Sequence, residues 1–134
     1  MGTCLARCAG LVLLLPAIGL AQEGDAKYEE VLQSLLGTLK QIAKTLDSVT
    51  DEATGEAARP ELKKQTEEFK ATRKKSEELA PPAPETRDRI SKKHQPEFEK
   101  ARKELIAQMA RVQRVPGGKA ALQEIRSVLE KSTP

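Results

Sequence analysis

His94 is the single imidazole in the chain, and its side chain is the one best suited to acid–base or metal chemistry. Lysines precede it at positions 92 and 93, and the only cysteines, Cys4 and Cys8, lie near the amino terminus. A metal site needs three or four ligands, and a general base needs a nucleophile and an orienting acid. No such set accompanies His94. We therefore expect it to lie at the edge of the apolar stripe of its helix, and we expect neither a metal nor a cofactor.

Three close pairs of acids have the composition of a glycosidase centre, in which burial must keep one carboxyl group protonated. Every pair stands beside lysines in a very polar segment, where burial is unfavourable. The sequence contains no glycine-rich phosphate loop, GxSxG turn or HExxH helix. These features predict a protein that is not an enzyme. The three pairs are Glu67 with Glu68, Glu77 with Glu78, and Glu97 with Glu99.

Basic residues gather between positions 73 and 93. Recognition of nucleic acid requires such clusters to be unopposed, or interleaved with stacking aromatic residues. Here glutamates intervene, aromatic residues make up 2% of the chain and the net charge is only +3, so no nucleic acid is expected. An anionic membrane or a cell-envelope polymer remains a possible partner. The candidate contacts are Arg73, Lys74, Lys75, Arg87, Arg89, Lys92 and Lys93.

The first 21 residues have the three parts of a secretory signal: a basic start, an apolar stretch from Ala9 to Leu20, and small residues before a cleavage site. Gly19 and Ala21 occupy the third and first places before the predicted cleavage between Ala21 and Gln22. The apolar stretch is too short to span a membrane comfortably, and cleavage also removes both cysteines. We expect a secreted or periplasmic protein with no transmembrane segment after cleavage.

Residues 22–134 are predicted to form a single helical domain. In its first helix, over 26–53, apolar residues recur in alternating steps of four and three from Tyr28 to Ala53, which is a heptad pattern. Further helices are expected over 57–80, 86–115 and 118–131, with Thr86 as a cap and a bend at Pro96. The centre of the heptad stripe is a candidate interaction seam: Leu32, Leu35, Leu39, Ile42 and Leu46.

No segment shows the sustained alternation of apolar and polar residues that marks a strand. The predicted fold is therefore all-α, an antiparallel helical hairpin or three-helix bundle with a short carboxy-terminal helix packed against it. The second helix carries only Leu62, Phe69 and Leu79 as large apolar residues, so it is too polar to cover the seam alone. Other parts of the chain or a partner must therefore bury the rest of the seam.

An exported, lysine- and glutamate-rich helical chain with heptads resembles small exported helical proteins of bacteria, including periplasmic holdase chaperones. The turn around Ala57-Ala58-Arg59-Pro60-Glu61-Leu62 is similar to one in uncharacterised exported proteins. The LTxxQ motif of one such chaperone family is absent. The resemblance implies binding of proteins between helices and transfers no functional residue.

Two functions follow from these observations. The first is a non-enzymatic exported protein that works through protein–protein contacts, either with itself or as a holdase or scaffold. The alternative is a peripheral binder of anionic membrane or cell-envelope polymers through residues 73–93.

Cleavage after Ala21 predicts the amino terminus of the native protein. Sequencing should begin at Gln22, or find it blocked if that glutamine has cyclised. Recovery of a chain that begins at Met1 or Gly2 would contradict the export prediction.

Overall fold

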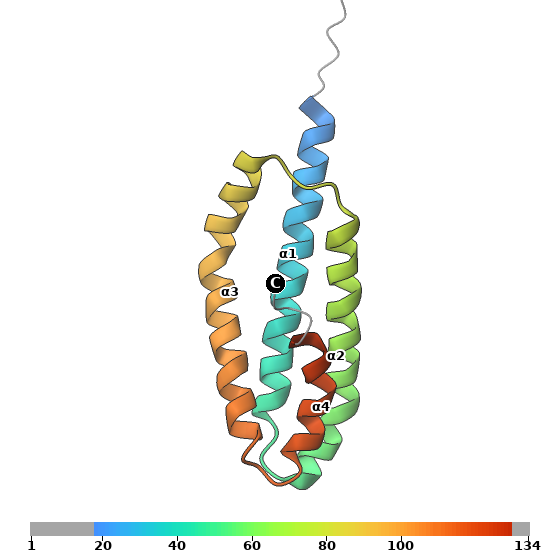
Figure 1. The fold of residues 1–134 in the computed structure, drawn as a ribbon, viewed down its shortest axis with the longest axis vertical. Coiled ribbons are helices and arrows are strands. Elements are labelled where there is room, and N and C mark those ends of the chain that lie inside the picture. Colours follow the sequence, from blue (N-terminus) through green and yellow to red (C-terminus); the bar gives the residue numbers. More distant parts are fainter. Residues whose placement is uncertain (1–17, 130–134) are drawn as a thin grey trace, which may run out of the picture.

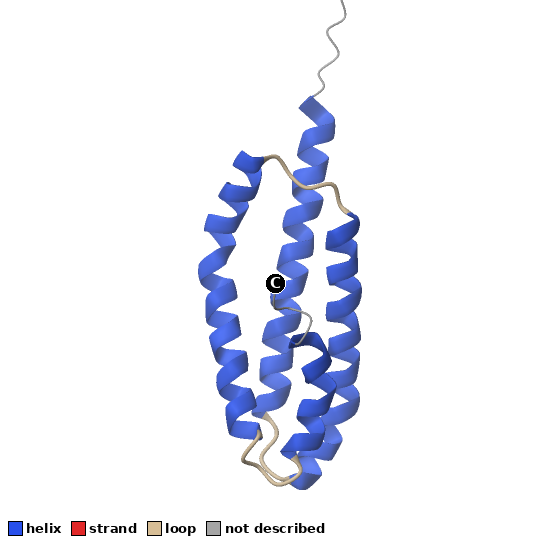
Figure 2. Cartoon of the chain, viewed as in Figure 1, coloured by secondary structure: helices blue, strands red, loops and turns tan. Residues whose placement is uncertain are grey.

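Four α-helices make up the described part of the chain: α1 (Ile18–Asp47), α2 (Glu52–Glu78), α3 (Pro84–Val112) and α4 (Gly118–Leu129). The structure is a computed structural model that describes the backbone of residues 18–129 and the side chains of residues 24–126. Within these limits there is no strand (Figure 2). The prediction of an all-α bundle is confirmed.

The central helix is α1, with α2 along one side and α3 along the other (Figure 1). Helix α2 returns antiparallel to α1, whereas α3 runs parallel to it, because the 79–83 connection crosses the end of the bundle. Helix α4 is short and packs mainly on α2. We call the end with the 48–51 and 113–117 connections the closed end, and the end with the 79–83 connection the open end.

The first two helices have different bounds from those predicted. Helix α1 begins at Ile18, shortly after Pro16, and ends at Asp47, although its heptad pattern continues to Ala53. The heptad pattern predicted too long a helix because Val49, which lies in the turn after α1, is fully buried like a core residue of the helix. Asp51 starts α2 instead. Its carboxylate accepts from the Thr54 backbone N–H at 2.8 Å, and the Thr54 hydroxyl accepts from the Asp51 N–H at 3.0 Å, a reciprocal cap.

Helix α3 also departs from prediction at its start. Pro84 occupies the first turn, where a missing N–H costs little, and Ala83 precedes it without a side-chain cap. Thr86 is not the cap; its hydroxyl donates to the Asp25 carboxylate of α1 at 2.9 Å. The helix continues past Pro96. That residue is exposed, so water can satisfy the carbonyl group that lacks its helical partner.

The apolar core lies toward the closed end, where side chains from all four helices meet. From α1 it contains Ile42, Ala43 and Leu46, each at most 2% exposed. Small residues of α2 and α4 allow these two helices to approach closely. The rest of the cluster is Val49, Ala58, Leu62, Leu105, Val112, Ala121, Leu122 and Ile125.

The closed end is fastened by Arg111 of α3. Its guanidinium donates to the carbonyl oxygens of Leu46 at 2.7 Å, Asp47 at 3.0 Å and Val49 at 2.8 Å. These carbonyls lie at and just beyond the end of α1, where the regular helical hydrogen bonds stop; Leu46 also accepts from the Val49 N–H of the turn at 3.1 Å. A cation at this end also interacts favourably with the helix dipole. Arg111 therefore caps α1 and fixes α3 against it.

Most of the predicted signal lies outside the described residues. Ala21 and Gln22 both fall within the backbone of α1, and their side chains are not described. None of the helices in the described part of the chain combines the length and hydropathy needed to cross a membrane.

The α3–α4 turn depends on two glycines. Gly117 has φ +76°, and a Cβ there would lie 2.8 Å from the Glu52 Cα. A Cβ on Gly118 would lie 1.9 Å from the Val112 carbonyl oxygen, which is backbone and cannot rotate away. Both positions therefore require glycine.

We expect Gly118→Ala to lower the free energy of unfolding by about 2 kcal/mol or more, because the added methyl group overlaps backbone. Gly37→Ala is the matched control, since no atom lies within 4 Å of a Cβ at that position in α1. That variant should gain about 0.5–1 kcal/mol from the better helix former. Chemical denaturation measures both. Equal midpoints for the two variants would contradict the packing at Gly118.

Candidate functional site

The predicted seam is covered along only half of its length. Ile42 and Leu46 are completely buried, whereas Leu32, Leu35 and Leu39 are only half-buried. This difference in burial matches the position of α4, whose Ala121, Leu122 and Ile125 join the core at the closed end. Toward the open end the described chain supplies no fourth helix (Figure 1).

Near the open end, polar contacts hold α3 to α1. Asp25 pairs with Thr86, and Glu29 contacts both Lys93 and the His94 Nε2, the latter at 2.9 Å. Further along, Lys40 and Glu97 form an ion pair at 3.2 Å. These polar contacts hold α3 against α1 without adding apolar cover to Leu32 and Leu35, which stay half-buried.

His94 is 7% exposed and belongs to this set of contacts. The hydrogen bond from Lys93 is the main reason that the pKa of Glu29 falls from 4.5 to about 2, and the contact with His94 is the second. The carboxylate therefore stays charged in mildly acidic solution. Its observed partners give His94 a structural role between α1 and α3.

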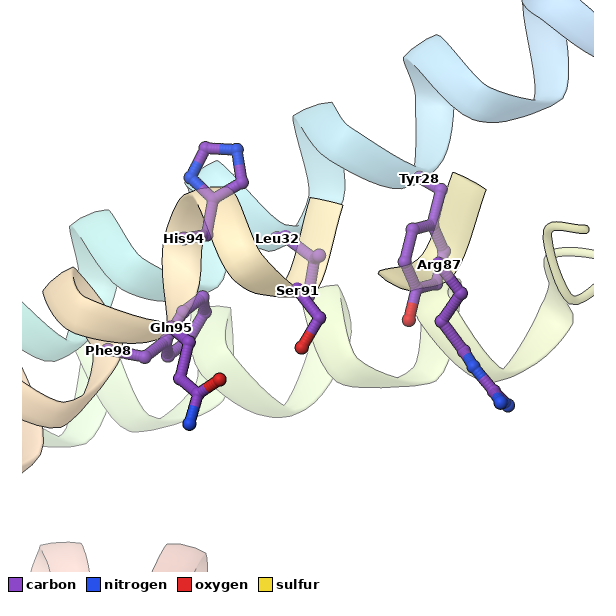
Figure 3. A pocket seen from close by; sticks show the side chains of 7 residues that line it. All are labelled: Tyr28, Leu32, Arg87, Ser91, His94, Gln95 and Phe98. Carbon is purple, nitrogen blue, oxygen red and sulfur yellow. The ribbon is translucent and has the colours of Figure 1, made fainter. Parts of the chain in front are cut away.

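A cavity of about 370 Å³ lies beside the half-covered seam, between α1 and α3. Figure 3 shows Ser91, Gln95 and Phe98 projecting from one side of α3, with the Tyr28 ring beside them and the His94 ring turned the other way. We call it the α1–α3 cavity. Arg87 carries the only permanent charge among its lining residues: Tyr28, Leu32, Arg87, Ser91, His94, Gln95 and Phe98.

The chemistry of this cavity is that of a binding surface. Leu32, Phe98 and the Tyr28 ring offer apolar contact, while the Tyr28 and Ser91 hydroxyls and Arg87 offer hydrogen-bond donors. The Gln95 amide already donates to the Glu99 carboxylate at 3.0 Å. No carboxylate lines it. An apolar group with a nearby acid would suit Leu32, Phe98 and Arg87.

The predicted polyanion contacts do not form one surface. Arg73, Lys74 and Lys75 lie on α2, whereas Arg87, Arg89, Lys92 and Lys93 lie on α3, with α1 between the two helices. Three of them are in ion pairs: Arg73 with Glu77 at 3.3 Å, Lys74 with Glu78 at 4.0 Å, and Lys93 with Glu29. Arg87 alone of the seven lines the α1–α3 cavity.

Ser91, Gln95 and Phe98 were not predicted from the sequence as site residues. Their spacing from Arg87, in steps of four, four and three, places them on a stripe next to the buried stripe of α3. This signal is present in the sequence, but only the position of α1 turns the stripe into a cavity wall.

No protein-family model, curated protein or solved structure matches this chain.

The lowered pKa of Glu29 predicts a dependence of stability on pH. Because the folded-state pKa of about 2 is below the ordinary 4.5, the contact stabilises fully above pH 4.5 and is lost as the pH falls toward 2. Glu29→Gln should therefore be less stable than wild type at neutral pH and approach it near pH 2. Urea unfolding across this range measures the difference.

The adjacent, exposed Glu30 supplies the control, because Glu30→Gln removes the same charge outside this contact. If both variants follow the same pH curve, the ion pair does not stabilise the fold.

Proposed function

We propose that the protein is a non-enzymatic exported protein that binds apolar segments of other proteins in the α1–α3 cavity. One observation carries the proposal: the seam is only partly buried at Leu32 and Leu35, where the described bundle has no fourth helix, whereas Leu39 already packs against the core. A partially covered apolar stripe next to a cavity is the usual form of a surface that receives another chain. The signal-like first 21 residues support export.

The holdase-like form of this function fits the shape of the site. The cavity is open and combines flexible polar side chains with Leu32 and Phe98. Such a surface tolerates different apolar side chains better than a closed, tightly shaped pocket does. His94 lines the cavity and also contacts Glu29, but its ring is turned away from Ser91 and Gln95 (Figure 3), so occupation of their side of the cavity does not require the His94–Glu29 contact to break.

Binding of anionic membranes or envelope polymers by residues 73–93 has less support. The cations stand on two separated helices, and Arg73, Lys74 and Lys93 already have acidic partners. Exposed ion pairs of this kind would have to be exchanged for contacts with the polymer.

The test measures binding of fluorescein-labelled, reduced and carboxymethylated α-lactalbumin, a permanently unfolded protein, by anisotropy. Leu32→Asp should weaken this binding by about tenfold, equivalent to ~1.4 kcal/mol, because it places a charge in the apolar part of the cavity. The matched control is Gln33→Asp, which introduces the same residue at the next, exposed position of α1. Circular dichroism confirms that both variants are folded.

The proposal is contradicted if the wild-type protein does not bind the unfolded probe. It is equally contradicted if Leu32→Asp and Gln33→Asp bind it as wild type does.

A further inference from the structure

A second cavity, of about 280 Å³, opens between α3 and α4. It is lined by Ile106, Met109, Ala110, Gln113, Leu122 and Arg126. Ile106 is 52% exposed and is the only large apolar side chain in the described part of the chain that is classed as exposed. We call it the α3–α4 cavity.

The two cavities follow one stripe of α3. From Arg87 the residues of the α1–α3 cavity reach Phe98 in steps of four, four and three, and the same steps lead from Phe98 through Arg102 and Ile106 to Met109. Eleven residues in three turns is close to the period of an α-helix, so this stripe runs almost straight along α3. Arg87 to Met109 spans about 33 Å at 1.5 Å per residue.

The charge of this stripe has a single sign. Arg87 is the only permanently charged residue of the first cavity, Arg126 is the only charged residue of the second, and the exposed Arg102 lies on the stripe between them. Neither cavity has a carboxylate in its lining, although the chain contains 20 acidic residues. The linings therefore combine apolar contacts with arginines, and one carboxylate borders them, since Glu99 accepts a hydrogen bond from the Gln95 side-chain amide at 3.0 Å.

Helix α4 shows how this fold holds an amphipathic helix. Its Leu122 and Ile125 enter the core, while Glu124 on its flank forms an ion pair with Arg59 of α2 at 3.5 Å. At the closed end the bundle thus binds a helix that has an apolar face and an acidic flank. The stripe on α3 offers the matching features, apolar side chains and arginines, over a greater length.

We infer that the two cavities form one docking surface for a long amphipathic helix of another protein, with an apolar face and glutamate or aspartate along its flank. This inference rests on the proposed function and specifies its partner. A length of about 22 residues would match the stripe. Carboxylates of the partner would reach Arg87, Arg102 and Arg126, as Glu124 reaches Arg59.

A second copy of this chain is a poorer occupant. Two copies related by a twofold axis would bring the same stripe of arginines together, and like charges that meet in an interface are unfavourable. The arginines that favour an acidic helix therefore disfavour a symmetric dimer through this face.

The experiment compares two labelled helical peptides of about 22 residues with identical leucine stripes. One carries glutamate at every flanking position and the other carries lysine. The acidic peptide should bind the purified protein about tenfold more tightly at low salt, and the difference should shrink as salt is added. Both cavities are then tested separately with variants that preserve the fold.

Arg87→Gln should reduce the preference for the acidic peptide by about threefold, whereas Arg89→Gln, two residues away and outside the lining, should not. Ile106→Ser should weaken binding of both peptides by about threefold, with Ala107→Ser as the control at the adjacent exposed position.

Three outcomes would overturn the inference. Equal affinity for the two peptides would contradict an acidic partner. An Ile106→Ser variant that binds as wild type does would show that the α3–α4 cavity is not part of the docking surface. A dimer in sedimentation equilibrium that Ile106→Ser dissociates would assign the surface to a second copy. In each case, binding of the unfolded probe that depends on Leu32 would leave the proposed function standing. Loss of that binding as well would refute both.

Discussion

The hydrogen bonds from Arg111 to the last carbonyls of α1 are the contact on which the closed end depends. One cation of α3 thus donates to three backbone carbonyls at and beyond the end of α1, of which Leu46 also accepts from the Val49 N–H at 3.1 Å. This fixes where α1 stops, and it keeps Val49 buried in the turn that follows. The start of α2 and the end of α3 are therefore held close together at this end of the bundle.

The closed end is compact because four helix ends converge there and glycines allow backbone to meet backbone. A Cβ on Gly55 of α2 would lie 3.5 Å from the Gly117 carbonyl oxygen, and Gly118 lies against the Val112 carbonyl. In the described part of the open end, backbones do not meet at glycines in this way. Its helices are joined by one proline-containing connection and held by side-chain ion pairs such as Glu29 with Lys93. The difference between the two ends leaves the seam half-covered and creates the proposed binding site.

Much of the fold could be predicted because helical periodicity is a local property. The seven-residue spacing of α1 indicated a long helix with one apolar face, and the chain has that helix. The ends were harder to predict, since the apolar pattern continued through Val49 while the chain turned. The Asp51 and Thr54 cap that starts α2 was not predicted, because the heptad signal of the first helix continued past both Val49 and Asp51.

The sequence by itself determined the class of the fold and the residues that must seek cover, because side-chain type and spacing decide which face of a helix is apolar. Only the tertiary structure decided which part of that face is covered. Helix α4 is too short to reach Leu32, and α3 lies parallel to α1 with its arginine-bearing stripe beside the uncovered half. Arg111 and Arg87 have the same side chain, yet one caps a helix and the other lines a cavity. Their surroundings, which come from distant parts of the chain, make that difference.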